Sequence, residues 1–223
     1  MRKTLSRLIP IPKTFLRRRN QAAAAPAQTL AASVEPFVPP GHFHSPIPSV
    51  DEIRQRTDTI FNIPNEIPAI DLNTDEQLRT LAAFAEYYKE LPFSPDKTRG
   101  FRYWFNNPMY SYSDGICLYS MMRHLRPQRI IEVGAGYSSC LMLDTNELFF
   151  DNSISLTIIE PYPETFLSLL KRGDAKRIEL LSSQLQDVGL DVFSSLSAND
   201  ILFVDSSHIS KVGSDVNYLI FEI

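Results

Sequence analysis

The sequence predicts an α/β fold in which a parallel sheet carries helices on both faces. Two observations in the second half of the chain lead to this prediction. Four short apolar segments alternate with helix-like stretches, and the first of these segments runs into a Gly-Ala-Gly turn that opens a helix. Strands that alternate with helices pair in parallel, because each connection returns the chain to the same end of the sheet. The 223 residues suffice for one sizeable core.

Three regions follow from composition: a disordered basic arm over 1–40, an N-terminal wrap and helical cap over 41–126, and the sheet domain over 127–223. Residues 1–40 carry a net charge of +6 and, because the whole chain carries −4, the remaining residues carry −10. A targeting peptide is the alternative interpretation of the arm. The acidic body argues against a nucleic-acid partner. The sequence has no run of about 18 apolar residues, so no membrane span is predicted. Its two cysteines give no disulfide framework, which favours the cytoplasm.

The cap is predicted to hold two helices. Thr74 and Gln77 form a capping-box pattern, and apolar residues then recur at helical spacing until Pro92. A second helix is expected from about Asp114, acting as its N-cap, to Leu125. The aromatic run over 101–105 is interpreted as core packing, with an acceptor platform or lid as the alternative.

The sheet is expected to begin at Arg129. The strand candidates are Arg129–Val133, Ile154–Ile159, Arg177–Leu181 and Ile201–Val204. Helices are expected from the Gly-Ala-Gly turn to about 150, over 163–172, over 189–196 and from about 215 to the end of the chain. Basic residues at 171 and 172 and Gly173 after them favour a helix end at that point.

The Gly-rich turn carries the chemistry of this sequence. Its glycines, Gly134 and Gly136, let the backbone turn tightly and approach a ligand. A dinucleotide would need a third glycine where Ser139 stands, and the Glu132 carboxylate at the end of the strand would repel a pyrophosphate. That carboxylate suits S-adenosylmethionine, which has no phosphate and carries two cationic groups. Glu160 ends the second strand, where an acid accepts hydrogen bonds from ribose hydroxyls of either nucleotide.

Three segments together resemble the class I S-adenosylmethionine-dependent methyltransferases, and within them a bacterial branch of uncharacterised members. The segments are RIIEVGAGYSSCLMLDT at 129–145, IIEPYP at 158–163 and NDILFVDSSHISKVGSDVNYLIFE at 199–222. The resemblance implies a Rossmann-like sheet of seven strands, of which about four are recognisable here, so the domain is expected to be incomplete at its C-terminus. Strand Ile201–Val204 would then form an exposed apolar edge through which the chain could pair with another copy.

The resemblance also implies roles for particular residues. The Gly-rich turn and the residues beside it would hold the methionine end of the cofactor, Glu160 its ribose and Gln186-Asp187 the region near its adenine. The predicted cofactor-binding residues are Glu132, Gly134, Gly136, Tyr137, Ser138, Glu160, Gln186, Asp187 and Asp205. Some members of the family use an acid at the position of Asp205 as a metal ligand, so a divalent metal is possible, although no ligand cluster in the sequence supports one.

His208 is the candidate general base and Asp205 the second candidate catalytic residue. Both follow the fourth strand, beside the predicted cofactor crevice, and an imidazole titrates near neutrality. We expect O-methylation of a small-molecule or sugar hydroxyl. A fixed loop without catalysis is the alternative for this pair of residues. For the whole chain, the alternatives are a non-catalytic truncated nucleotide-binding remnant and an NAD-dependent oxidoreductase.

Overall fold

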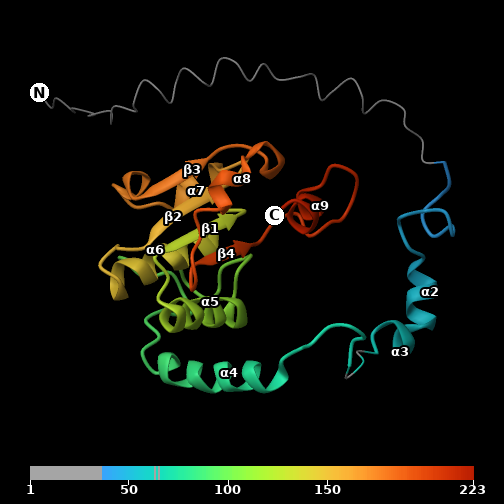
Figure 1. Ribbon diagram of the computed structural model, residues 1–223, viewed down its shortest axis with the longest axis horizontal. Coiled ribbons are helices and arrows are strands. Elements are labelled where there is room, and N and C mark those ends of the chain that lie inside the picture. The colour runs from blue at the N-terminus through green and yellow to red at the C-terminus, as the bar shows by residue number, and fades with distance from the viewer. Residues whose placement is uncertain (1–36, 63, 65) are drawn as a thin grey trace, which may run out of the picture. The chain divides into compact units, whose positions relative to one another are not determined.

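The computed structural model describes residues 37–62, 64 and 66–223 and divides the chain into two compact units, Met1–Asp71 and Leu72–Ile223 (Figure 1). Most of the predicted basic arm therefore lies outside the described residues. In the first unit, two short helices, α2 (Val50–Gln55) and α3 (Thr57–Ile60), bury no side chain. Ser49 caps α2, because its Oγ accepts the Glu52 backbone N–H at 3.3 Å.

The second unit holds a four-stranded parallel sheet, as predicted. Its strands are β1 (Arg129–Val133), β2 (Ser155–Ile159), β3 (Ile178–Leu181) and β4 (Ile201–Val204), in the order β3-β2-β1-β4. The chain moves outward from β1 to β3 and then returns to the other side of β1 with β4. In open parallel sheets, ligands bind at the carboxyl ends of the strands where the order reverses, which here is between β1 and β4.

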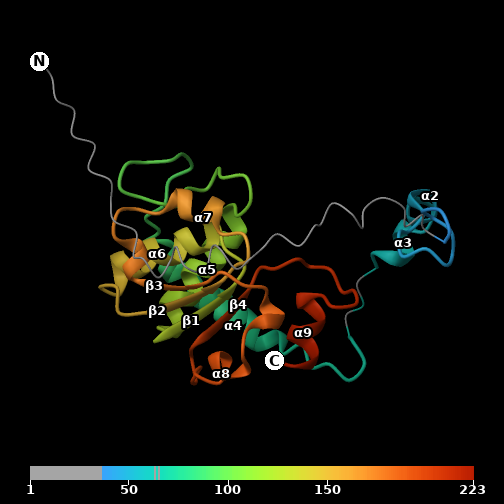
Figure 2. The same cartoon turned by 90° about the horizontal axis from the view of Figure 1, so that it is seen from above.

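Helices cover both faces of this sheet (Figure 2). Besides the four strands, the unit contains α4 (Thr74–Tyr88), α5 (Tyr112–Leu125), α6 (Tyr137–Phe149), α7 (Glu164–Leu169), α8 (Leu190–Phe193), α9 (Asp215–Phe221) and two 3-10 turns, η1 (Asp174–Lys176) and η2 (Leu185–Asp187). The described fold is a Rossmann-like α/β fold. None of its helices in the described residues is long and apolar enough to cross a membrane.

The two faces of the sheet have different cores. Ile130 points into a large aromatic core with α5, α6 and α7, whereas its neighbour Ile131 points into a smaller core with η2 and α8. Side chains alternate between faces along a strand, so Glu132 lies on the same face as Ile130. The predicted packing role of the aromatic run is confirmed for Tyr103 and Phe105, which are both buried in the larger core.

Several predicted helix ends were wrong. The first cap helix has Asn73 as N-cap in a left-handed conformation, without a side-chain cap, and ends at Tyr88. The second begins at Tyr112, which makes Asp114 a first-turn residue and not the N-cap. The helix expected over 163–172 ends at Leu169, because Leu170 is extended. The short helix after η2 spans four residues, and not the eight expected over 189–196. Periodicity identifies helices well, but tertiary contacts set their ends.

Candidate functional site

A cavity of about 460 Å³ opens at the carboxyl ends of β1, β2 and β4. Each strand contributes the residues at its tip, and the segments after β3 and before α9 close the remaining sides. The lining residues are Val133, Gly134, Ile159–Tyr162, Gln184–Gln186, Asp205–Ser207, Lys211 and Gly213–Asp215. This volume falls within the range of small-molecule and cofactor sites. The cavity lies at the end of the sheet where the reversal of strand order predicts a ligand.

Gly134 connects the strand tips and must be glycine. Its φ is +99°, its N–H donates to the Ile159 carbonyl at 2.9 Å, and the Asp205 N–H donates to the Val133 carbonyl at 2.9 Å. A Cβ on Gly134 would collide with the backbone carbonyl of Asp205. The absence of a side chain therefore allows β4 to bring Asp205 next to the turn.

One backbone amide of the turn is already bonded within the protein. The Gly136 N–H donates a hydrogen bond to Ser139 Oγ at 3.0 Å. Ser139, which stands where a dinucleotide motif has its third glycine, is therefore already the acceptor of this amide. Tyr137 and Ser138 then begin α6. Gly136, Tyr137 and Ser138 lie beside the cavity wall formed by Gly134 but are not among its lining residues. Their predicted cofactor contacts stay predictions.

Glu132 lies behind the turn and not in the cavity. The residue is 1 % exposed, Oε1 accepts a hydrogen bond from the Ser138 hydroxyl at 2.5 Å, and Oε2 has no hydrogen-bond partner in the part of the chain that the structure describes. Burial raises the pKa of Glu132 to about 7, against the lowering effect of the Ser138 and Ser139 hydroxyls, and the nearby carboxylates of Asp205 and Glu160 add to the rise. The expected carboxylate is therefore next to the Gly-rich turn, but the structure gives it no direct access to a ligand in this cavity.

Glu160 lines the cavity from the tip of β2. Its Oε1 accepts the Tyr162 backbone N–H at 2.7 Å, which fixes the carboxylate at the strand end. Gln186, also in the lining, donates from Nε2 to the Gly213 carbonyl at 2.7 Å and so ties η2 to the segment before α9. Asp187 is in η2 but not among the lining residues. Of the predicted cofactor residues, Gly134, Glu160, Gln186 and Asp205 thus converge on one cavity.

Asp205 and His208 form the pair that the sequence predicts after β4. Asp205 Oδ1 lies 3.1 Å from His208 Nε2, so His208 Nδ1 is left facing outward. His208 has a φ of +59° and a side chain that is 71 % exposed. Asp205 lines the cavity, whereas His208 stands outside its lining. The pair is formed, and the carboxylate is the member that a bound molecule would meet first.

Sequence reasoning missed the segment before α9. Lys211 and Asp215 both line the cavity. Burial would raise the pKa of Asp215, but hydrogen bonds from the Ser207 hydroxyl and backbone and from Ser206 lower it to about 2. The carboxylate thereby fixes the loop that carries Asp205. The available signal was the KVGSD run directly before a predicted helix, with Ser214 as its N-cap, whose Oγ accepts the Asn217 N–H.

A second cavity of about 540 Å³ lies between α5 and β4. Its apolar walls are formed by Met109, Leu118, Met121, Ile201, Phe203 and Val204, and its polar lining residues are Tyr110, Asp114, Cys117 and Asp205. Asp205 thus lines both cavities, one on each side of the tip of β4. Nothing in the sequence pattern pointed to this second cavity, because its walls come from two elements that are about 80 residues apart.

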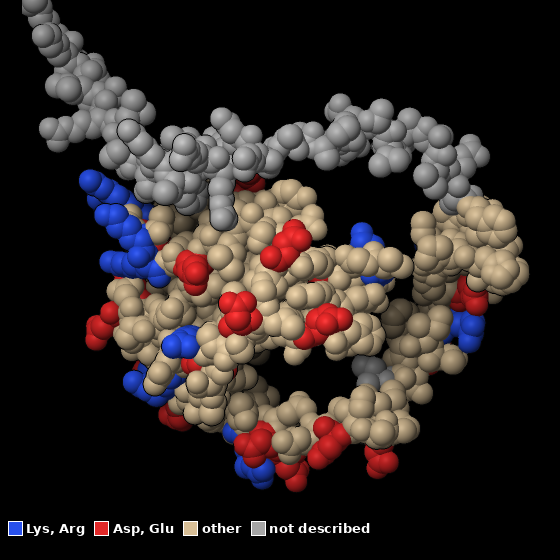
Figure 3. Space-filling view, turned by 45° about the horizontal axis from the view of Figure 1, so that its top comes forward, with Lys and Arg blue, Asp and Glu red and all other residues tan. Residues whose placement is uncertain are grey.

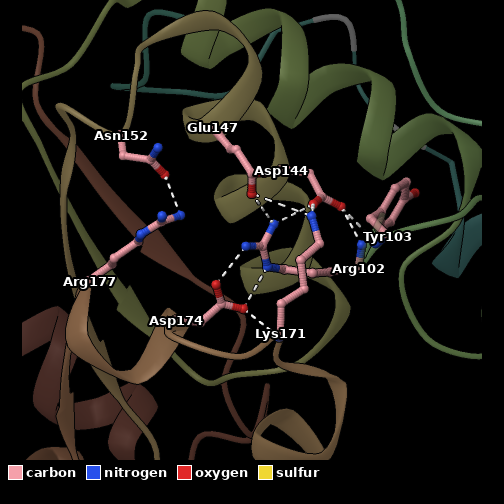
Figure 4. A network of polar contacts seen from close by, with 8 residues as sticks. All are labelled: Arg102, Tyr103, Asp144, Glu147, Asn152, Lys171, Asp174 and Arg177. Atoms are coloured by element: carbon pink, nitrogen blue, oxygen red, sulfur yellow. Dashed lines mark hydrogen bonds and ion pairs between the residues drawn. The ribbon is translucent and has the colours of Figure 1, made fainter. Parts of the chain in front are cut away.

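A buried ion network anchors α6, the helix that begins at the Gly-rich turn (Figure 4). Arg102 is 2 % exposed and binds Asp144 of α6 at 2.5 Å and Asp174 of η1 at 2.6 Å. Glu147 and Lys171 complete the network at its partly exposed side. Two residues beyond Arg102, Trp104 meets the ring of Tyr137 edge to face at 5.2 Å between centroids. The network therefore holds the loop over 101–105 against the helix that carries the turn.

Charged side chains are distributed without a broad basic surface on the face shown in Figure 3. Acidic side chains are scattered over this face, and most of the basic ones lie along one margin of the sheet unit. Among the described residues, no group of three or more His, Cys, Asp or Glu side chains could hold a metal ion. The residues present therefore do not fit the divalent metal that the resemblance allowed.

The fold and the site define a Rossmann-like α/β protein with a ligand-sized cavity at the switch point of its sheet. No known family model matches the chain. A protein of Archaeoglobus fulgidus (strain ATCC 49558 / DSM 4304 / JCM 9628 / NBRC 100126 / VC-16), described as "Uncharacterized protein", is 34% identical over 194 residues, which cover 84% of this chain and 86% of that protein. The chain belongs to the same family as this Archaeoglobus fulgidus protein.

Two solved structures match part of the chain at low sequence identity and low TM-score. "CmcI-N160 apo-structure" is 15% identical with a TM-score of 0.39, and the match covers 71% of this chain and 60% of that one. "cmcI-D160 Mg-SAM" is 18% identical with a TM-score of 0.38, and the match covers 66% of this chain and 59% of that one. The chain thus spans about three fifths of the length of the solved chains that it resembles.

Proposed function

We propose that this chain binds S-adenosylmethionine and that its activity is methyl transfer to a hydroxyl of a small molecule or sugar. The observation that carries the proposal is the convergence of Glu160 and Asp205 on the cavity at the switch point. One carboxylate ends β2 and the other follows β4, with the glycine turn between them. S-adenosylmethionine has ribose hydroxyls for the Glu160 carboxylate and cationic groups for the Asp205 carboxylate.

The residues of the cavity fit this cofactor better than a dinucleotide. Two acidic side chains line the wall near Gly134, and the Gly136 amide that a diphosphate would use already donates to Ser139. Lys211 is the basic side chain among the lining residues that the structure describes. It would pair with the carboxylate of the methionine part. When bound, the cofactor would supply a methyl group carried on a sulfonium. The sulfur leaves as a neutral thioether, which is a good leaving group.

The protein then has two tasks: orienting the acceptor and removing its proton. His208, whose Nε2 lies 3.1 Å from the Asp205 carboxylate, forms with Asp205 the pair that would take the hydroxyl proton. Glu132 acts from behind the turn, where its negative form would stabilise a cation in front of it.

Calorimetry with S-adenosylhomocysteine and with NADH tests the proposal. We expect binding of S-adenosylhomocysteine alone, and Glu160→Ala should weaken it roughly tenfold, because a charged hydrogen-bond acceptor is lost. Glu164→Ala is the matched control: this exposed residue of α7 lies four positions further on and outside the cavity. Binding of NADH alone would establish the oxidoreductase instead, and binding of neither compound would favour a non-catalytic remnant.

We further propose that the sheet edge formed by β4 pairs with a second copy of the chain. Within the described residues β4 is an edge strand, and its Leu202 and Val204 are 36 % and 42 % exposed. Unpaired edges of this kind favour association. Sedimentation over a concentration series tests the pairing, and Val204→Lys should shift the protein toward monomer. A monomer at all concentrations would contradict it.

A further inference from the structure

The second cavity has walls suited to an apolar ring. Met121 of α5 and Phe203 of β4 face it from opposite elements, and its volume of about 540 Å³ is that of a site for a small organic molecule. The thioether of a methionine packs favourably against aromatic rings, so these walls suit a planar ligand. Because Asp205 lines both cavities, a molecule in the second one reaches the tip of β4 from the side opposite the first.

The lining of this cavity contains two carboxylates, Asp114 and Asp205, and no cation among the described residues. Among the described residues Asp114 has no ion-pair partner, and the printed side-chain partner of the Asp205 carboxylate is the imidazole of His208. Burial raises the pKa of the Tyr110 hydroxyl in the same lining, and the carboxylates of Asp114, Asp205 and Glu132 add to the rise. Of the lining residues that the structure describes, none is Lys, Arg or His. An ammonium would be attracted to this cavity, and a carboxylate or phosphate would be repelled.

We propose that the second cavity holds the methyl acceptor and that this acceptor is an aromatic hydroxyl compound with an ammonium group. The ammonium lies at Asp114 and the hydroxyl at Asp205. The acceptor role rests on the function proposed above. In the reaction, the acceptor oxygen forms a bond to the methyl carbon as the sulfur–methyl bond breaks. The electron pair of that bond stays on sulfur, which becomes a neutral thioether, and the hydroxyl proton passes to the Asp205–His208 pair through the Asp205 carboxylate, which lines the cavity.

The two cysteines of the chain provide a direct test, because Cys117 is exposed in the cavity and Cys140 is fully buried. The rate at which the native protein reacts with a disulfide reagent such as DTNB then reports on the accessibility of Cys117. Two probes share the same phenol ring: 4-(2-aminoethyl)phenol is a cation and 3-(4-hydroxyphenyl)propanoate is an anion. We expect the amine to slow the reaction at least fivefold at saturation and the propanoate to leave it unchanged.

Variants separate selectivity from general occupancy. Asp114→Asn should weaken protection by the amine roughly tenfold. The matched control is Asp75→Asn, since Asp75 also lies exposed in the first turn of a helix but outside the cavity, and it should leave protection unchanged. Equal protection by both probes, or full protection in Asp114→Asn, would overturn the proposal. So would a Cys117 that reacts only in urea, because the cavity would then be closed by polypeptide.

The acceptor role is tested separately from the cofactor. Incubation with S-adenosylmethionine and 4-(2-aminoethyl)phenol should yield the methyl ether, detected by mass spectrometry, and no product with the propanoate. If S-adenosylhomocysteine binds but the amine does not protect Cys117, this inference fails and the proposed function stands. If the amine protects but S-adenosylhomocysteine does not bind, the proposed function fails and the acceptor role fails with it.

Discussion

Carboxylates in two regions of the sheet unit have opposite surroundings. Around Arg102, the carboxylates of Asp144 and Asp174 are buried, and each pairs with the guanidinium. Burial would raise the pKa of Asp174, but hydrogen bonds from Arg102 and the Lys171 amide lower it. At the strand tips, burial raises the pKa of Glu132, and the neighbouring Asp205 adds to that rise. In the first region each buried carboxylate pairs with a cation of the protein, and in the second Glu132 has no ion-pair partner among the described residues.

This difference separates structural acids from candidate binding acids. A buried ion pair satisfied on all sides contributes specificity, and removing one partner leaves a buried charge without compensation. A buried carboxylate with an unpartnered oxygen, as in Glu132, reduces stability in the empty protein.

Replacing Arg102 should have the largest effect. Arg102→Met leaves Asp144 and Asp174 buried without their cation, and we expect the free energy of unfolding to fall by about 3–5 kcal/mol. Urea unfolding followed by circular dichroism at pH 7 measures the change. A loss below about 1 kcal/mol would show that the network is solvated, and that the two regions do not differ in the way described.

Gly134→Ala should have the second largest effect, because the added Cβ would push apart the tips of β1 and β4. The left-handed φ and the collision with the Asp205 carbonyl together should cost roughly 3 kcal/mol of unfolding free energy. Gly136→Ala is the matched control, since a Cβ at Gly136 meets nothing within 4 Å. Thermal unfolding of both variants checks the prediction. Equal Tm values would mean that β4 does not approach the turn as closely as the structure shows.

Glu132→Gln should reveal the cost of the strand-tip charge through its pH dependence. The pKa of Glu132 in the folded protein, about 7, lies above its usual value of 4.5, so between these values the folded state binds the extra proton. The contribution of this group to stability is therefore present below about pH 4.5 and is lost as pH rises to about 7. The unfolding free energy of Glu132→Gln should exceed that of the parent by on the order of 3 kcal/mol at pH 8 and equal it at pH 4.5.

The same substitution separates stability from binding. Glu132→Gln should weaken S-adenosylhomocysteine binding while it raises stability at pH 8, because a neutral amide no longer attracts a cation. Glu164→Gln, an exposed change of the same kind, serves as control for both measurements. Stability curves of variant and parent that run parallel across pH 4.5–8 would show that Glu132 does not titrate in this range.

An exposed ion pair should have the smallest effect. Arg79 and Glu76 pair on the surface of α4, with side chains 68 % and 53 % exposed. Because both charges are well solvated, Arg79→Met should change the unfolding free energy by less than about 1 kcal/mol. This variant is the matched control for Arg102→Met. A loss as large as that of Arg102→Met would attribute the effect to charge in general and not to burial.

The local parts of this protein could be predicted from its sequence. The four strands and the Gly-rich turn depend on runs of neighbouring residues, and so does the placement of Glu160 and Asp205 at strand ends. The parts that could not be predicted join distant positions. Arg102 meets Asp144 and Asp174 across 42 and 72 residues. The direction of the Glu132 side chain could not be predicted either, because it depends on which face of β1 packs against α6.

By itself, the amino-acid sequence determined that strands alternate with helices and that a glycine stands where β1 must turn, because both follow from local conformational preference. Only the tertiary structure decided which carboxylates receive a cation from within the protein. The physical reason is that the energy of a charge depends on burial and on partners brought together from distant segments. Asp144 and Glu132 are both buried acids, but only Asp144 lies within reach of a guanidinium.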